Sequence, residues 1–366
     1  MAFTRNAPPA SPAQDWKPEG YARRPVVEVI ETSYVGVVVV TAMRVPIVHC
    51  FRRRVPACIA WFVAIIVAGC GATSSDPGTP PRVEPDSGTP TEASAPCIAP
   101  RAAPDWLDAF LADHMARLTG EIEAAPGMKL TDRGTPANRR ATRTYLAGAL
   151  RSLGFSPTEH DYGEGANVVA PLPATIDAPS EWVVVGAHFD GAADSPGAND
   201  NATGVAVVLA VARAVASLPC RSRGVMFVFF DQEEEGLKGS NAFATREVQG
   251  GTRIVAAHTI DQVGWDDDDD RTFEIERPTP ALLAEYQAGA AAVDARAVET
   301  KTSGTDHQAF RTRGFAAVGV TEEYVNGDTS PHRHLAGDTR PTVKASYQAL
   351  AVRLVTYVIA RELGAE

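Results

Sequence analysis

The sequence predicts an α/β domain with a mixed, largely parallel central sheet flanked by helices. Residues 183–187, 225–230 and 254–260 form short apolar runs without polar alternation, which is typical of strands buried on both faces. Residues 201–217 are apolar along most of their length and are long enough for a helix. Strands that alternate with helices favour parallel neighbours, because a parallel pair needs a long crossover connection.

Further helical segments are expected on either side of these elements. Residues 105–118 and 137–153 are predicted to form leading helices, and residues 342–363 a closing helix. The stretch 101–366 has a length typical of one α/β domain. No large insertion separates the polar motifs within it, so we expect a single domain there.

The amino-terminal third carries the features of an export signal. Three arginines, residues 52–54, precede an apolar run that is shorter than the roughly 20 residues needed to cross a bilayer. The run ends in Val67-Ala-Gly-Cys70, which resembles a bacterial lipobox and implies cleavage before Cys70 and lipidation of its sulfur. An ordinary secretory signal with an incidental cysteine is the alternative. The expected location is the bacterial cell envelope, on its periplasmic or extracellular face, with the membrane as partner.

The segments around this signal have no catalytic features. Residues 43–69 are predicted to be the signal peptide, and 1–42 an extension that arises from a start codon placed before the true one at Met43. Residues 70–100 are rich in Pro, Ser, Thr and Gly, which predicts a disordered tether. Two cysteines then remain, Cys97 and Cys220, and an exported protein permits a disulfide between them.

The net charge of −11 argues against nucleic acid as a partner, because binding phosphates requires a basic surface. The sequence does not indicate the oligomeric state. The acidic run 266–270 lacks the alternation and glycine of a calcium loop, so it is interpreted as a solvated turn.

Metal-ligand residue types follow the apolar runs in a fixed order. They are His188, Asp200, the pair Glu233 and Glu234, Asp261 and His334. Side chains that follow parallel strands meet at one edge of the sheet. Imidazole and carboxylate are good zinc ligands, a pair of zinc ions needs a bridging carboxylate, and a further carboxylate must remain as general base. The pattern therefore predicts a hydrolase with two Zn²⁺ per chain.

Five motifs together resemble the co-catalytic zinc exopeptidases of metallopeptidase family twenty-eight, which includes bacterial aminopeptidases and glutamate carboxypeptidase. They are Gly186-Ala-His188-Phe-Asp190, Asn199-Asp200-Asn201, Glu233-Glu-Glu-Gly-Leu-Lys-Gly-Ser240, Ile260-Asp261 and His334 with Asp338-Thr339. The resemblance covers residues 101–366 and implies the phosphorylase/hydrolase-like fold of zinc exopeptidases.

By this resemblance, His188 and Asp261 would hold the first zinc, Glu234 and His334 the second, and Asp200 would bridge both. Glu233 would be the general base, with Asp190 accepting a hydrogen bond from the His188 imidazole. A shifted register, in which Glu234 and Glu235 take these roles, is the alternative. Family members have a cis peptide at the position of Asp200-Asn201.

The substrate region departs from the family pattern. Arg333 stands where family members often have Tyr, so it either donates to the oxyanion or faces solvent. Asp306 and His307 resemble a family segment near the substrate pocket, and Tyr324 is expected to line the same cleft. A free amino terminus needs an acidic partner, for which Glu322 or Glu323 is the candidate.

The expected function is release of amino-terminal residues from peptide substrates. Three alternatives remain open at this point. A carboxypeptidase of the same fold would need a basic residue in the cleft, a glutaminyl cyclase would bind one zinc, and a non-catalytic binding module would have lost its metals.

Overall fold

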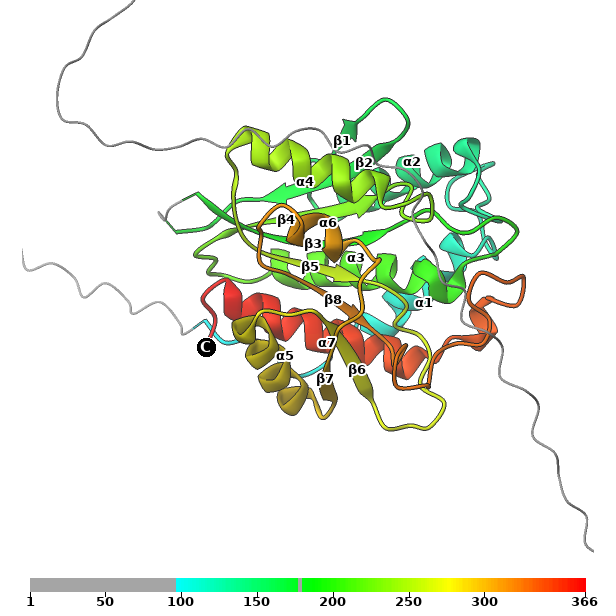
Figure 1. Cartoon of the computed structure of the whole chain (residues 1–366). Coiled ribbons are helices and arrows are strands. Elements are labelled where there is room, and N and C mark those ends of the chain that lie inside the picture. The colour runs from blue at the N-terminus through cyan, green and yellow to red at the C-terminus, as the bar shows by residue number, and fades with distance from the viewer. Residues whose placement is uncertain (1–96, 177–179) are drawn as a thin grey trace, which may run out of the picture. The chain divides into compact units, whose positions relative to one another are not determined.

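The computed structural model describes residues 97–176 and 180–366, and one mixed sheet forms the centre of this part of the chain (Figure 1). The predicted signal peptide, Cys70 and most of the predicted tether lie outside the described residues. The strands are β1 Thr158–Asp161, β2 Ala166–Leu172, β3 Glu181–His188, β4 Gly224–Phe230, β5 Arg253–Ile260, β6 Thr272–Glu276, β7 Arg296–Thr300 and β8 Ala317–Thr321. The helices are α1 Leu107–Leu118, α2 Pro136–Ser152, α3 Gly204–Ala216, α4 Lys238–Gly250, α5 Pro280–Val293, α6 His307–Arg311 and α7 Ala345–Glu362.

The sheet has eight strands in the order β1-β2-β4-β3-β5-β8-β6-β7. The central pairs β4/β3, β3/β5 and β5/β8 are parallel, as is β6/β7, whereas β1/β2, β2/β4 and β8/β6 are antiparallel. The predicted mixed, largely parallel sheet is therefore confirmed. Its parallel centre directs the carboxyl ends of β3, β4 and β5 to one edge.

Both faces of the sheet are covered, which explains why its central strands lack polar alternation. Val183 and Val185 of β3 belong to a large apolar core with α1, α3, α5 and α7. Val184 points to the opposite face, where it packs with Phe243 of α4 and Phe310 of α6. Figure 1 shows α4 and α6 over one side of the sheet and the red α7 beside α5.

Local sequence signals set the ends of several helices. Thr135 caps α2 by accepting from the backbone N–H of Asn138, and a proline occupies the first turn. Thr279 caps α5 in the same way. The predicted helix 201–217 begins at Gly204 instead, because residues Ala198–Thr203 form a π-helical turn in which Asp200 and Asn201 depart from helical angles.

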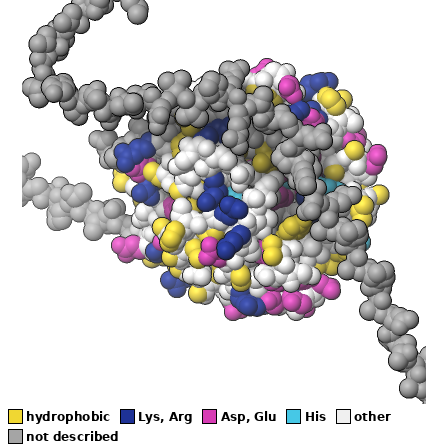
Figure 2. Space-filling model, in the orientation of Figure 1, with side chains coloured by type: hydrophobic (Ala, Val, Ile, Leu, Met, Phe, Trp, Pro, Cys, Tyr) yellow, Lys and Arg dark blue, Asp and Glu magenta, His cyan; other side chains and the backbone are white. Residues whose placement is uncertain are grey.

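Cys97 and Cys220 lie side by side, with their Cα atoms 6.1 Å apart. This separation is within the range that a disulfide allows, and the bridge itself stays a prediction. None of the helices in the described residues is long and apolar enough to cross a membrane. Figure 2 shows acidic and basic side chains interspersed over the visible face.

Candidate metal centre

Three of the predicted ligands form a buried donor group, which we call the first group: His188, Asp200 and Asp261. His188 is the last residue of β3, and Asp261 directly follows β5. His188 Nε2 lies 3.3 Å from Asp261 Oδ1 and 3.4 Å from Asp200 Oδ1. The three residues are 1%, 4% and 7% exposed. The edge of the sheet thus assembles donors that are far apart in the sequence.

A second group consists of Asp200, Glu234 and His334. His334 Nε2 lies 3.1 Å from Asp200 Oδ2 and 3.1 Å from Glu234 Oε2. The two oxygens of Asp200 therefore face different imidazoles, Oδ1 toward His188 and Oδ2 toward His334. This is the geometry that a carboxylate needs in order to bridge two cations.

The donor set fits zinc. Two imidazoles and three carboxylates match its preference for nitrogen and oxygen ligands. Glu234 Oε1 and His188 Nδ1 are buried and have no hydrogen-bond partner among the described residues. Burial raises the pKa of Asp261, and the nearby charges of Asp200 and Glu276 raise it further against the lowering effect of His188. A cluster of buried carboxylates of this kind is stabilised by a bound cation.

Asp190 supports the turn between β4 and α4 that carries the two glutamates. Its Oδ1 accepts from the backbone N–H of Glu233 at 3.0 Å, and its Oδ2 accepts from that of Glu234 at 3.2 Å. Its Oδ1 also lies 3.5 Å from His188 Nδ1, which is long for a hydrogen bond. Asp190 is thus close to the imidazole as expected, but its principal bonds go to the turn, whose free N–H groups require acceptors.

The three consecutive glutamates point in different directions. Glu234 joins the second donor group, whereas Glu235 is exposed and accepts from Lys238 and Gln232. The alternative register, with Glu235 as ligand, therefore does not fit. Burial raises the pKa of Glu233 well above its usual range, and the opposite charge of His188 lowers it. Glu233 lies close enough to His188 and Asp261 for their charges to act on it.

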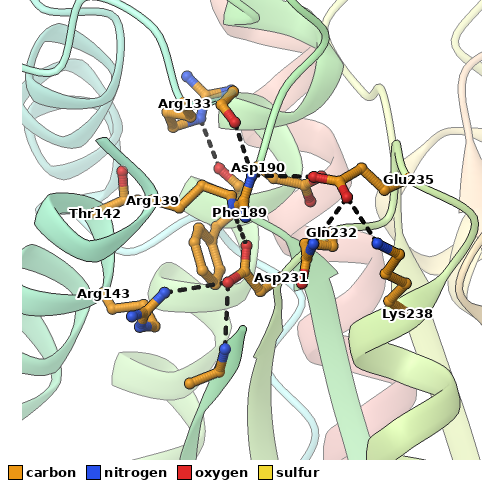
Figure 3. Close-up of polar contacts among 12 residues, drawn as sticks. Arg133, Arg139, Thr142, Arg143, Phe189, Asp190, Asp231, Gln232, Glu235 and Lys238 are labelled. Carbon is orange, nitrogen blue, oxygen red and sulfur yellow. Dashed lines mark hydrogen bonds and ion pairs between the residues drawn. The ribbon is translucent and has the colours of Figure 1, made fainter. Parts of the chain in front are cut away.

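A buried ion-pair network lies behind this turn (Figure 3). Asp231 is fully buried, with Oδ1 2.8 Å from Arg139 Nε and Oδ2 3.1 Å from Arg143 Nη1. Both arginines come from α2, so the network fastens α2 to the residues just before Glu233. The sequence interpretation did not include these residues. The available signal was an acid directly after an apolar strand, together with arginines four positions apart on a helix.

Arg133 connects the loops that surround the first group. It is fully buried and donates from Nε to Phe189 O at 2.8 Å and from Nη2 to Gly197 O at 2.6 Å. Nη1 donates to Leu118 O at 2.9 Å. Figure 3 shows Arg133 beside Phe189. One side chain therefore holds both the loop after His188 and the turn before Asp200.

Two further acids orient the π-helical turn that contains Asp200. Asp338 accepts from the backbone N–H of Asn199 at 2.7 Å and from that of Asp200 at 3.0 Å. Glu322 is 1% exposed and accepts from the Asn199 side chain and from the backbone of Trp265 and Ser330. Burial raises the pKa of Glu322 to about 8, against these hydrogen bonds.

The contacts of Glu322 argue against a role in binding a substrate amine, whereas that role stays a prediction for Glu323. Both oxygens of Glu322 are already occupied by hydrogen bonds that join loops. Glu323 lies among acids: burial raises its pKa to about 7, as do the neighbouring charges of Asp270 and Asp268.

The remaining predicted substrate residues lie next to the first group. A cavity of about 260 Å³ is lined by Asp261, Tyr324 and Arg333, among others. The Arg333 guanidinium lies 5.4 Å from the Tyr324 ring centre, and its Nε is 3.4 Å from Asp200 Oδ2. Arg333 thus points toward the centre, although its side chain is 39% exposed.

Asp306 and His307 are buried and are not among the residues that line this cavity. Asp306 is 3% exposed, and burial raises its pKa to about 7, with the charge of His188 lowering it. His307 is fully buried, and its Nδ1 lies 3.2 Å from Glu276 Oε2. The peptide bond between Asp200 and Asn201 is cis, as in the family that the sequence resembles.

This fold and donor set are those of the metal-dependent hydrolases. Residues 167–358, more than half of the chain, match the model of peptidase family M28, and the chain belongs to this family. It is 27% identical over 250 residues to leupeptin-inactivating enzyme 1 of Streptomyces exfoliatus. The aligned region covers 64% of this chain and 54% of that enzyme. The chain thus spans about half the length of this curated relative. The matches to aminopeptidase YwaD of Bacillus subtilis and to the probable lipoprotein aminopeptidase LpqL of Mycobacterium tuberculosis cover only 15% and 12% of those proteins.

Solved structures agree on the fold. The LapA aminopeptidase of Legionella pneumophila matches with a TM-score of 0.63 at 18% identity, over 71% of this chain and 70% of that one. A glutaminyl cyclase of Porphyromonas gingivalis matches with a TM-score of 0.57 at 18% identity, over 70% and 98%. At these identities the likeness establishes the fold alone.

Proposed function

We propose that the protein is a zinc-dependent aminopeptidase that holds two Zn²⁺ ions and releases amino-terminal residues from peptides. The observation that carries this proposal is the position of Asp200, whose two oxygens face one imidazole each. His188 and Asp261 would hold one ion, and Glu234 and His334 the other. Membership of peptidase family M28 supports peptide substrates.

In the proposed mechanism, Glu233 is the general base. Zinc held by the two donor groups would supply Lewis acidity, which would acidify the attacking water and polarise the scissile carbonyl. Glu233 accepts a proton from the attacking water at its carboxylate and returns it to the leaving amine nitrogen. Asp190 keeps Glu233 in place through the backbone N–H. Arg333, beside Asp200, is available to donate to the oxyanion.

A Glu233→Gln variant tests the proposal. We expect both zinc ions to remain and turnover to fall by about 100- to 10,000-fold, the usual contribution of a general base. Glu235→Gln is the matched control, because Glu235 is a neighbouring exposed carboxylate outside both groups. Near wild-type turnover in Glu233→Gln would contradict the assignment of Glu233 as general base. A wild-type protein that is folded but binds no zinc would contradict the proposed zinc centre.

A carboxypeptidase activity is the second candidate, because Arg333 supplies the basic residue that a terminal carboxylate requires. Peptides blocked at one end separate the two activities. An aminopeptidase cleaves peptides with an amidated carboxyl terminus and spares those with an acetylated amino terminus. One zinc per chain would favour a glutaminyl cyclase, and two zinc ions without any turnover would favour a binding module.

We also propose export and lipid anchoring through Cys70. The support is the arginine-rich, apolar and lipobox-like sequence of residues 52–70. Metabolic labelling with a radioactive fatty acid would mark the wild type and not Cys70→Ala. Equal labelling of both proteins would contradict the proposal.

A further inference from the structure

The cavity beside Asp261 has an unusual lining for a pocket that receives a substrate side chain. Besides Tyr324, its wall is polar or charged, with threonines, a serine, Gln262, Glu276, Glu322 and Arg333, and no aliphatic side chain is present among the described residues. Its volume of about 260 Å³ is below the usual range for whole ligands and suits one amino-acid side chain. A large aliphatic residue would find no aliphatic side chain to pack against there.

Glu276 lies at the inner end of this cavity. It is the last residue of β6 and is 1% exposed, whereas the Arg333 side chain on the same wall is 39% exposed. Glu276 pairs with Gly319 of β8 in the sheet, and a side chain at Gly319 would collide with Glu276 Oε2. The glycine therefore makes the room in which a buried carboxylate fits.

One oxygen of Glu276 is fixed and the other is free. Thr305 donates to Oε2 at 2.9 Å, and His307 Nδ1 lies 3.2 Å from the same oxygen. Oε1 makes no hydrogen bond within the part of the chain that the structure describes. A carboxylate that is held by one oxygen and open at the other is arranged to receive a donor from the cavity.

No lysine or arginine forms an ion pair with Glu276 among the described residues. His307 Nδ1 lies 3.2 Å from Glu276 Oε2 and 2.8 Å from Thr305 Oγ1, so the imidazole shares one nitrogen between these two groups. The cation on the wall, Arg333, lies next to Asp200 instead. A buried carboxylate without a full partner favours a cationic ligand.

We propose that this cavity selects substrates whose amino-terminal residue has a cationic side chain, lysine or arginine, with Glu276 as the specificity-determining residue. This inference rests on the proposed aminopeptidase function. The side-chain ammonium or guanidinium donates to Glu276 Oε1, and the threonine and serine hydroxyls of residues 302–305 solvate it further. The α-amine remains beside the scissile bond, and therefore beside the donor groups, of which Glu276 is not a member.

A peptide panel that differs only in the first residue tests this with the whole protein loaded with zinc. Lysine and norleucine have unbranched side chains of similar length and differ in charge. We expect kcat/KM for lysine and arginine peptides to exceed that for norleucine and leucine peptides by at least about tenfold. Faster cleavage of norleucine or leucine than of lysine overturns the inference and leaves the proposed function intact. No cleavage of any peptide removes the proposed function itself.

A Glu276→Gln variant keeps the shape and removes the charge. We expect kcat/KM for lysine and arginine to fall by about 10- to 100-fold, and the lysine-to-norleucine ratio to collapse toward one. An equal loss for all peptides would assign Glu276 to the α-amine or to positioning of His307, and would overturn the inference. The matched control is Glu274→Gln on the same strand, a buried glutamate that accepts from the backbone of residues 325 and 326 and does not line the cavity.

Discussion

The two donor groups share Asp200 but are built differently. The first group takes His188 and Asp261 from the ends of two neighbouring buried strands, β3 and β5. The second takes Glu234 from a turn and His334 from a loop, where His334 has a φ of 59° and a side chain that is 39% exposed. The sheet places the strand-borne donors, and Arg133 holds the loop that follows His188. Of the loop-borne donors, Glu234 has additional support, because Asp190 accepts from its backbone N–H and the α2 arginines hold Asp231 at the start of its turn.

The largest expected effect separates the two groups directly. We expect His334→Ala to retain one zinc and to lose the other, whereas His188→Ala also loses stability because its site is buried. Turnover should fall more than about 100-fold in both, since loss of a residue that merely orients a ligand already costs 10- to 100-fold. Zinc per chain and thermal unfolding measure this. Identical metal loss and stability in the two variants would erase the difference between the groups.

A smaller effect is expected behind the Glu233-Glu234 turn. Arg139→Met removes one partner of buried Asp231 and leaves Arg143. Breaking a buried pair costs about 3–5 kcal/mol, and the remaining arginine should keep the loss below that range. The second zinc should weaken and the first should not. Arg140→Met, an exposed neighbour on the same helix, is the control. If the variant instead bound the first zinc less tightly and the second unchanged, the Asp231 network would support the first group.

The smallest effect concerns acid sensitivity away from both groups. His114 of α1 is buried beside Tyr145, and burial lowers its pKa to about 4 from 6.5. The His114 imidazole is therefore protonated near pH 6.5 in the unfolded chain and only near pH 4 in the folded chain. The contribution of neutral His114 to the free energy of unfolding is fully present above pH 6.5. It is lost as the pH falls through 4, and the loss is at most about 3 kcal/mol.

Chelator-treated wild type and His114→Gln, unfolded by denaturant between pH 4 and 7, measure this contribution. The variant should lose less stability than the wild type over this interval. Parallel curves would trace the acid sensitivity to other groups, including the carboxylates and imidazoles of the centre.

The sequence predicted the parts of the fold in which burial is complete. Strands β3, β4 and β5 are apolar on both faces, so their positions and the donors that follow them could be read directly. Strand β6 reads Thr-Phe-Glu-Ile-Glu, a pattern typical of a half-exposed strand, yet both of its glutamates are buried. Glu274 accepts from the backbone of a loop and Glu276 lines the cavity. Both surroundings are formed by segments distant in the sequence, so the sequence alone does not indicate them.

The residues that hold the loops around the donor groups were not predicted, for a similar reason. Arg133 donates to backbone carbonyls, which any sequence supplies, so no partner residue marks its role. The role of Asp338 was within reach, because it lies four positions after His334 in the same motif. Helix α5 was also within reach, since Thr279-Pro280 repeats the Thr135-Pro136 start of α2.

The hydrogen bonds of Arg133, Asp338 and Glu322 have a consequence for the stability of the loops around Asp200. Each of them joins loops near Asp200 through contacts within the chain itself. Part of the shape of the centre is therefore held by hydrogen bonds of the polypeptide itself, so these three residues contribute to the stability of the fold as well as to the placing of Asp200.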